Sequence, residues 1–190
     1  THRQWSFDDV FDFAELKKWD EKVRNFMKKA GMEKEPLEYC CELKIDGLKI
    51  ILTYEDGLLV RGATRGDGEV GEDVTVNVKT IRSVPTRVAS VDGKTIIVVG
   101  EAWIGRDSLK AINKERIKVG EPVFANSRNL AAGSMRQLDP KMTAKRRLDS
   151  FLYDIEAVDG RPRQLRTQSA ELELLNKLGF KINPHFKVFN

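Results

Sequence analysis

The first segment with a clear hydrophobic pattern repeats its apolar residues at helical spacing. Between residues 13 and 30 these residues share one side of a helix, and they are Leu16, Trp19, Val23, Phe26, Met27 and Ala30. Asp12 is a typical N-cap, and Gly31 is typical of the position just beyond a helix end. The pattern predicts an amphipathic helix whose apolar stripe packs against a core, within a helical lead-in that spans residues 1–35.

After Pro36 the period changes to the two-residue alternation of strands, with turn signals at Asp56-Gly57 and Asp92-Gly93. The expected strands cover residues 39–45, 48–54, 58–64, 86–104, 148–158 and 180–189. Helical patterns occupy 107–118, 126–138 and 167–178, and in the first of these Leu109, Ile112 and Ile117 are expected to face inward. We therefore expect an α+β core over residues 36–190, with mixed, mainly antiparallel sheets and flanking helices.

The composition adds an asymmetry of charge and excludes two classes of protein. The formal net charge is +4, but the first 95 residues carry 16 basic and 18 acidic side chains, whereas the remainder carry 17 and 11. The basic surplus of the second half favours an anionic partner there. No apolar run reaches the roughly 20 residues that span a bilayer. The adjacent Cys40 and Cys41 do not form a disulfide framework. We expect a cytoplasmic protein with no membrane segment.

The most informative segment reads ELKIDG at residues 42–47. In an extended chain alternate side chains share a face, so Glu42, Lys44 and Asp46 point one way while Leu43 and Ile45 point into a core. A lysine between two carboxylates, before a glycine that allows close approach, is typical of either a solvated charge ladder or a reactive site. The alternation by itself leaves both interpretations open and favours the ladder.

Two further clusters carry charges at spacings suited to phosphate. The segment ATRGDGEVGED at residues 63–73 has glycines and Arg65 that could cradle a phosphate, or it could form plain turns. Arg128 and Arg136 lie eight residues apart in a segment rich in small residues. On a helix they would be about 80° apart around the axis. They could therefore grip one phosphate backbone or form surface salt bridges.

Taken together and in this order, the segments resemble the adenylation domain of bacterial NAD-dependent DNA ligases. KIDG at 44–47 is similar to the Lys-x-Asp-Gly motif that DNA ligases share with RNA ligases and mRNA capping enzymes. The surrounding series is more specific and comprises ATRGDG at 63–68, GEDVT at 71–75, GE at 100–101, FAN and RN within 124–129, AAGS at 131–134 and RQLDP at 136–140. The resemblance covers nearly the whole chain and implies a DNA-ligase-type nucleotidyltransferase fold, which is ATP-grasp-like.

The resemblance implies a role for each matching residue. Lys44 would attack the adenylyl phosphorus of NAD and hold AMP as a phosphoramide, and Asp46 would be the motif carboxylate used in phosphoryl transfer. The positions implied near the nucleotide are Glu42 for adenine, Glu101 for ribose, Arg65 for ribose and phosphate, Tyr153 for stacking on adenine, and the pair Ser6 and Phe7. The positions implied to engage nicked DNA near its 5′-phosphate are Arg128 and Arg136.

The resemblance also implies partners and a cofactor. These are NAD and AMP, nicked double-stranded DNA, and magnesium, with the protein acting as a monomer. The sequence ends at Asn190, before the downstream lysine motifs of the family. We therefore expect these residues to form a partial domain that binds adenylate and adenylates itself slowly or undetectably from NAD, without sealing nicks.

Two other functions stay open at the level of sequence. One is a nucleotidyltransferase that uses ATP or GTP, and the other is a non-catalytic module that binds a nucleotide or DNA. A lysine attacks only as the free amine, and neighbouring carboxylates favour the ammonium form, so catalysis would require desolvation, nearby cations or a metal ion. Lys49 lies beyond the motif, and nothing in the sequence ties it to the site.

Overall fold

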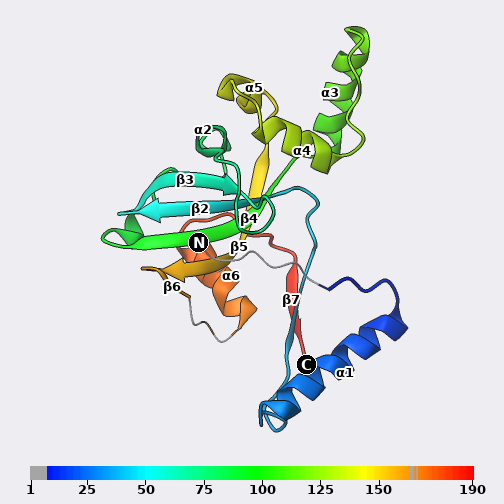
Figure 1. Ribbon diagram of the computed structural model, residues 1–190, viewed down its shortest axis with the longest axis vertical. Coiled ribbons are helices and arrows are strands. Elements are labelled where there is room, and N and C mark those ends of the chain that lie inside the picture. The colour runs from blue at the N-terminus through cyan, green and yellow to red at the C-terminus, as the bar shows by residue number, and fades with distance from the viewer. Residues whose placement is uncertain (1–7, 163–164, 166) are drawn as a thin grey trace.

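The computed structural model describes residues 8–162, 165 and 167–190. Its centre is a five-stranded sheet in the order β3-β2-β4-β5-β6 (Figure 1). The strands are β2 (Leu48–Glu55), β3 (Leu58–Thr64), β4 (Thr95–Trp103), β5 (Asp149–Val158) and β6 (Arg161–Pro162). Each pair of neighbouring strands in this sheet is antiparallel. The expected α+β class with mainly antiparallel pairing is therefore confirmed.

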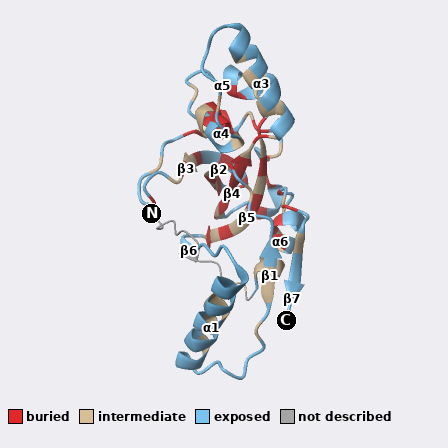
Figure 2. Ribbon diagram, turned by 90° about the vertical axis from the view of Figure 1, so that its right-hand side faces the viewer, coloured by how far each residue is buried: buried red, intermediate tan, exposed pale blue. Residues whose placement is uncertain are grey.

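One face of this sheet carries the hydrophobic core (Figure 2). Alternate residues of β2, namely Ile50, Leu52 and Tyr54, are completely buried there. The core also takes side chains from α6 (Gln168–Lys177) and from the segment between β3 and β4, which contains α2 (Thr75–Val78) and the 3-10 helix η1 (Ala89–Val91). Burying each large apolar side chain contributes about 1.5–3 kcal/mol. The core thereby leaves the other face of the sheet free for polar groups.

We call this second face the site face and define it by Lys49, Glu101 and Phe151. The register pairs Lys49 of β2 with Glu101 of β4, and Glu101 with Phe151 of β5. Each of the three is next in sequence to a residue of the core, namely Ile50, Ala102 or Leu152, so their side chains lie on the opposite side of the sheet. The pairing places a cation, a carboxylate and an aromatic ring side by side across three strands.

Three helices connect β4 to β5 beyond one end of the sheet: α3 (Arg106–Lys118), α4 (Ser127–Met135) and α5 (Pro140–Lys145) (Figure 1). Helix α4 buries Ala131 and Met135 in the core. By contrast, none of the described residues of α3 is buried, and Ile117 is 66% exposed. The expected inward orientation of Ile117 is wrong because α3 extends away from the sheet and packs on α4. The short helices α2 and α5 have too few residues to give a helical pattern in the sequence.

A buried asparagine ties these helices to the sheet. The Asn77 side chain donates to the backbone carbonyls of Met135 at 2.7 Å and Gln137 at 2.8 Å, and it accepts from Thr143 Oγ1 at 3.2 Å. Asn77 is 4% exposed, so water does not replace these partners. Through these bonds one residue of α2 fixes the C-terminal end of α4 and the middle of α5. The position of α4 matters because it carries Arg128.

Helix α1 (Phe13–Lys29) and a two-stranded ribbon of β1 (Tyr39–Glu42) and β7 (Phe186–Phe189) lie to one side of the sheet (Figure 1). Asp12 caps α1 as expected, and the Trp19 ring packs against Tyr39 at 5.4 Å between centroids. None of the described residues of α1 is buried, so the expectation that its apolar stripe packs into a core is wrong. In the described part of the chain, α1 borders the ribbon instead of the main sheet. No helix in this part is long and apolar enough to cross a membrane.

Three expected strands are shorter in the structure. The strand expected at 39–45 ends at Glu42, because its partner β7 begins at Phe186 and the chain then crosses to the main sheet. Leu43 is therefore 58% exposed, which corrects its expected burial. Similarly, residues 86–94 form η1 and turns in place of a strand, and only Phe186–Phe189 of the segment 180–189 is extended into a ladder.

We expect Asn77→Ala to lower the free energy of unfolding by about 2–3 kcal/mol, because it leaves the buried carbonyl of Met135 and the partly buried carbonyl of Gln137 without their donor. Urea denaturation followed by circular dichroism measures this loss. Asn25→Ala, on the exposed surface of α1, is the matched control and should change stability by less than about 0.5 kcal/mol. Equal stability of the two variants would contradict the bracing role of Asn77.

Candidate active site

The segment that carries Lys44 and Asp46 is anchored to β4 at Gly47. The Gly47 backbone N–H donates to Glu101 Oε1 at 3.2 Å. A Cβ atom at position 47 would lie 2.2 Å from the carbonyl oxygen of Ala102, so no other residue fits without a shift of the backbone. The glycine thus allows the close approach that its place in the motif suggested. It brings the Lys44 loop to the edge of Glu101.

Glu101 is the centre of charge in this region. Its side chain is largely buried, and burial raises the pKa of its carboxyl group above the ordinary value. Four groups oppose that rise: the Arg128 guanidinium, the Gly47 N–H, and the Lys44 and Lys49 ammonium groups. All four favour the ionised carboxylate. The structure therefore gathers three cations from separate segments around one carboxylate.

Arg128 reaches this carboxylate from the first turn of α4. Its Nη1 atom lies 3.7 Å from Asp46 Oδ1 and 4.0 Å from Glu101 Oε1. Asn126 caps the helix by accepting from the backbone N–H of Asn129 at 2.8 Å, which fixes the turn that presents Arg128. Arg128 partly neutralises both of these carboxylates, although its side chain remains 54% exposed.

Tyr153, Glu42 and Arg65 lie at the same site. Burial is the main cause that raises the pKa of Tyr153, and the charges of Glu101, Asp154 and Glu42 add to it while Arg65 opposes it. Glu42 has a raised pKa because neighbouring protein desolvates it, and a hydrogen bond from Gln168 limits the rise. Gln168 also donates to the backbone carbonyl of Tyr153 at 2.9 Å. The N-terminal turn of α6 therefore links Glu42 to Tyr153.

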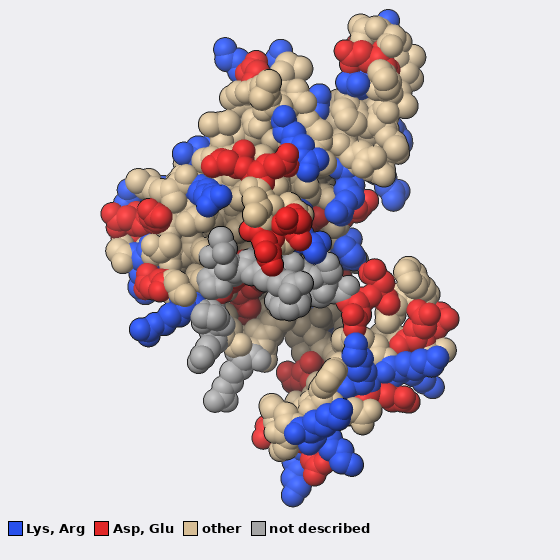
Figure 3. Space-filling model, in the orientation of Figure 1, with Lys and Arg blue, Asp and Glu red and all other residues tan. Residues whose placement is uncertain are grey.

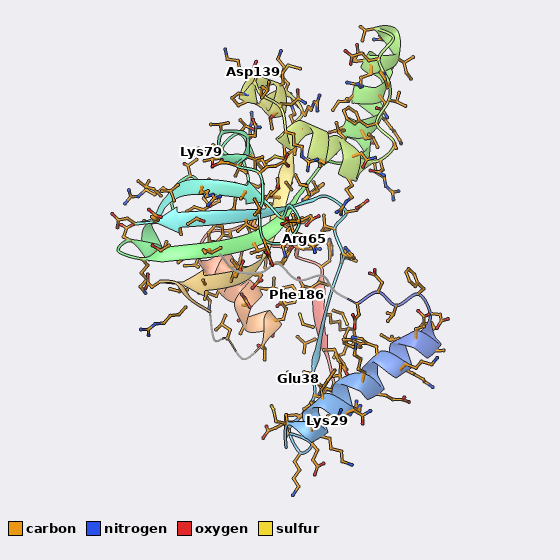
Figure 4. The ribbon with its side chains drawn as sticks, in the orientation of Figure 1. Lys29, Glu38, Arg65, Lys79, Asp139 and Phe186 are labelled. Atoms are coloured by element: carbon orange, nitrogen blue, oxygen red, sulfur yellow. The ribbon has the colours of Figure 1, made fainter. Side chains whose placement is uncertain are left out.

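Arg65 follows β3 directly, at the same end of the sheet as the segment that leads into β2 (Figure 4). The glycine-rich loop after it is a set of closed turns. The backbone N–H groups of residues 67–70 all donate within the loop, those of Glu69 and Val70 to the Asp67 carboxylate. These bonds lower the pKa of Asp67. The loop thus fits the turn interpretation, and its contribution to the site is the Arg65 side chain.

Arg136 is placed differently from Arg128. It caps the far end of the nine-residue helix α4, and its Nε atom lies 2.6 Å from Glu72 Oε2 of the glycine-rich loop. The two arginines are separated by about 12 Å along the helix axis. They contact different acidic partners at opposite ends of α4. Ser6 and Phe7, the other pair expected beside the nucleotide, lie outside the described residues.

Sequence reasoning missed Lys49 and Gln168. Lys49 stands directly across from Glu101 on the site face, and burial is the main cause that lowers its pKa. The expectation that nothing ties Lys49 to the site is therefore wrong. The two-residue alternation of β2 could have placed Lys49 opposite the buried Ile50, but only the pairing of β2 with β4 puts Glu101 beside it. Gln168 belongs to α6 and lies more than a hundred residues after Glu42 in the sequence.

The residues that the structure describes offer no group of three or more histidine, cysteine, aspartate or glutamate side chains that could hold a metal ion. Asp46 and Glu101 both face Arg128.

Comparisons with known proteins identify the family of this chain. The family model "NAD-dependent DNA ligase adenylation domain" matches residues 1–190. A DNA ligase of Carboxydothermus hydrogenoformans is 48% identical over 98% of this chain and 27% of its own length, and one of Lactiplantibacillus plantarum is 48% identical over 96% and 26%. The solved ligase domain of LigD from M. tuberculosis has a TM-score of 0.47 and 20% identity, over 78% of this chain and 40% of its own. The chain spans about a quarter of the curated relatives that it matches. It belongs to the family of NAD-dependent DNA ligase adenylation domains.

Proposed function

We propose that this chain carries the adenylyl-transfer steps of NAD-dependent DNA ligation, with Lys44 as the nucleophile. The observation that supports this most directly is that Arg128 lies 4.0 Å from Glu101, whose carboxyl group also feels the charge of Lys44. The three come from a loop, a strand and a helix that are far apart in sequence. A plain solvated ladder would not require Arg128 from α4 to reach the motif carboxylate Asp46.

In the first step, the unprotonated amine of Lys44 attacks the adenylyl phosphorus of NAD. The nitrogen–phosphorus bond forms as the pyrophosphate bond breaks, and nicotinamide mononucleotide leaves with the electron pair of that bond. The attacking amine releases a proton to solvent. Arg128 assists by offsetting the negative charge of Asp46 and Glu101, which would otherwise favour the ammonium form of the lysine and repel the incoming phosphates.

In the second step, an oxygen of the 5′-phosphate at a nick attacks the same phosphorus. The phosphoramide bond breaks, and the lysine nitrogen takes up a proton as it leaves. In the third step, the 3′-hydroxyl attacks the activated 5′-phosphate, loses its proton and displaces AMP, which seals the strand. Magnesium, if carried in with the nucleotide, would supply positive charge to the phosphate oxygens.

The adenosine part of the ligand fits the side chains around Tyr153. Glu42 would accept from the adenine amino group, the Tyr153 ring would stack on the base, and Glu101 would accept from a ribose hydroxyl. Arg65 would face the ribose and phosphate. The grouping of these four residues by their mutual electrostatic effects supports the assignment.

Nicked DNA is the proposed macromolecular partner, and the protein acts as a monomer. Basic side chains lie where α3 and α4 meet the rest of the molecule, with acidic groups among them (Figure 3). Arg128 and Arg136, both about half exposed, are the candidates to contact the strand near its 5′-phosphate. Phosphate oxygens of the DNA would then replace the carboxylates that these arginines contact in the free protein, because arginine binds phosphate at least as well as carboxylate.

We expect this chain, incubated for hours with NAD and magnesium, to gain the mass of one AMP slowly, at Lys44. Lys44→Ala should abolish the adduct because it removes the nucleophile. Lys94→Ala, at an exposed turn beyond the far end of β2, should keep it. Intact-protein mass spectrometry with peptide mapping measures the outcome. Equal labelling of the two variants would mean that Lys44 is not the nucleophile. An adduct formed from ATP but not from NAD would favour an ATP-using enzyme.

We expect Gly47→Ala to reduce the rate of this labelling at least about tenfold, because relief of the clash with Ala102 must displace the Lys44 loop and weaken the bond to Glu101. Gly105→Ala is the control, since a Cβ atom there meets nothing within 4 Å. The same mass assay applies, with thermal denaturation to verify that both variants fold. Unchanged labelling in Gly47→Ala would contradict the anchoring role of the glycine.

A further inference from the structure

Lys49 lies on the site face beside Glu101 although it lies outside the recognised motif. It pairs across β4 with Glu101, and its neighbour Ile50 pairs with Thr64, the last residue of β3 before Arg65. Arg65 therefore leaves β3 next to Lys49, and the Arg65 charge acts on the Lys49 ammonium. A row of two cations and one carboxylate crosses the ends of three strands. Lys44 acts on the same carboxylate from the adjoining loop.

The Lys49 side chain is half-buried, and its ammonium group has no close hydrogen-bond or ion-pair partner among the described residues. Burial lowers its pKa, and the charges of Asp154, Glu156 and Glu101 oppose that effect from a distance. In the part of the chain that the structure describes, no hydrogen bond or ion pair within 4.0 Å engages this ammonium. Desolvating a cation without a close partner is costly. A bound anionic ligand would supply the missing partner and offset this cost.

Glu101 does not need Lys49 as its partner. It already accepts the Gly47 N–H at 3.2 Å and faces Arg128 at 4.0 Å, and these contacts have the larger effect on its carboxyl group. Asp154 and Glu156 belong to β5, two strands away from β2 in the sheet. The position of Lys49 between Arg65 and the Lys44 loop therefore points to a role toward a ligand.

We propose that Lys49 binds the phosphate group of the adenylate and so acts as a second lysine of the nucleotide site. This inference rests on the proposed function, because it takes the adenylate to lie over Glu101 and Tyr153. Lys44 attacks the phosphorus, whereas Lys49 contacts a non-bridging oxygen and holds the phosphate against the nucleophile. Lys49 is a substrate-binding group of the reaction and gives up no proton in it.

The test compares ligands that differ only in the phosphate. Isothermal titration calorimetry measures the dissociation constants of AMP and adenosine for the 190-residue chain. The variants are Lys49→Met, which keeps the aliphatic stem and removes the charge, Lys49→Arg, which keeps the charge, and the control Lys94→Met. We expect Lys49→Met to weaken AMP about tenfold or more and adenosine less than about twofold, since a charged hydrogen bond is lost only for AMP. Lys49→Arg should restore most of the affinity for AMP, and Lys94→Met should change neither constant.

Each other result overturns the inference in a distinguishable way. Unchanged affinity of Lys49→Met for AMP would show that Lys49 does not contact the ligand, while the proposed function would stand. An equal loss of affinity for AMP and for adenosine would mean that Lys49 acts only through the position of Glu101 or the stability of the fold. Binding of neither ligand to the unsubstituted chain would overturn the proposed nucleotide site and the inference with it.

Discussion

The contact between Gly47 and the end of β4 is the constraint on which the rest of the site depends. The backbone of Gly47 lies too close to the carbonyl of Ala102 to allow any side chain, and its N–H binds Glu101. Because β2 begins at the next residue, the contact also sets the register that places Lys49 opposite Glu101. One close approach thus positions the nucleophile loop, the central carboxylate and the second lysine together. The steric clash excludes every other residue at position 47, whereas a salt bridge only favours one arrangement over another.

The balance of charge at the site centres on Glu101, whose carboxyl group is largely buried. Burial raises the pKa of this carboxyl group, and cations from α4, β2 and the Lys44 loop offset the effect. These segments converge because the core on the opposite face fixes the sheet, and Asn77 fixes α4 against it. The ion pair of Arg136 with Glu72 joins the glycine-rich loop to α4 as well, but both groups are about half exposed. Such an exposed pair contributes at most about 1 kcal/mol, so it adds little to the stability of the contact between the loop and α4.

The sequence went far in predicting local elements and the family. The cap at Asp12, the hairpin turn at Asp56-Gly57 and the strands on either side of it all lie where the pattern places them. These features depend on neighbours within a few residues, so the spacing of residue types records them. The same holds for the series of short motifs, whose family the comparisons confirm. Electrostatic effects connect Glu101 with Lys44, and Tyr153 with Glu42, Arg65 and Glu101, but the assignment of these residues to a nucleotide site stays a prediction.

The sequence by itself determined the longer helices, the hairpin and which motif residues to consider, because backbone sterics and periodicity act over a few residues. Only the tertiary structure decided which side chains are buried and which groups lie beside them. Leu43 is exposed because β1 loses its partner after Glu42, and the stripe of α1 is only partly covered because α1 borders the two-stranded ribbon and not the main sheet. Lys49 enters the site because β4, some fifty residues later, pairs with β2 in one register. Burial and electrostatic neighbours are set by such long-range contacts, and a linear pattern carries no measure of them.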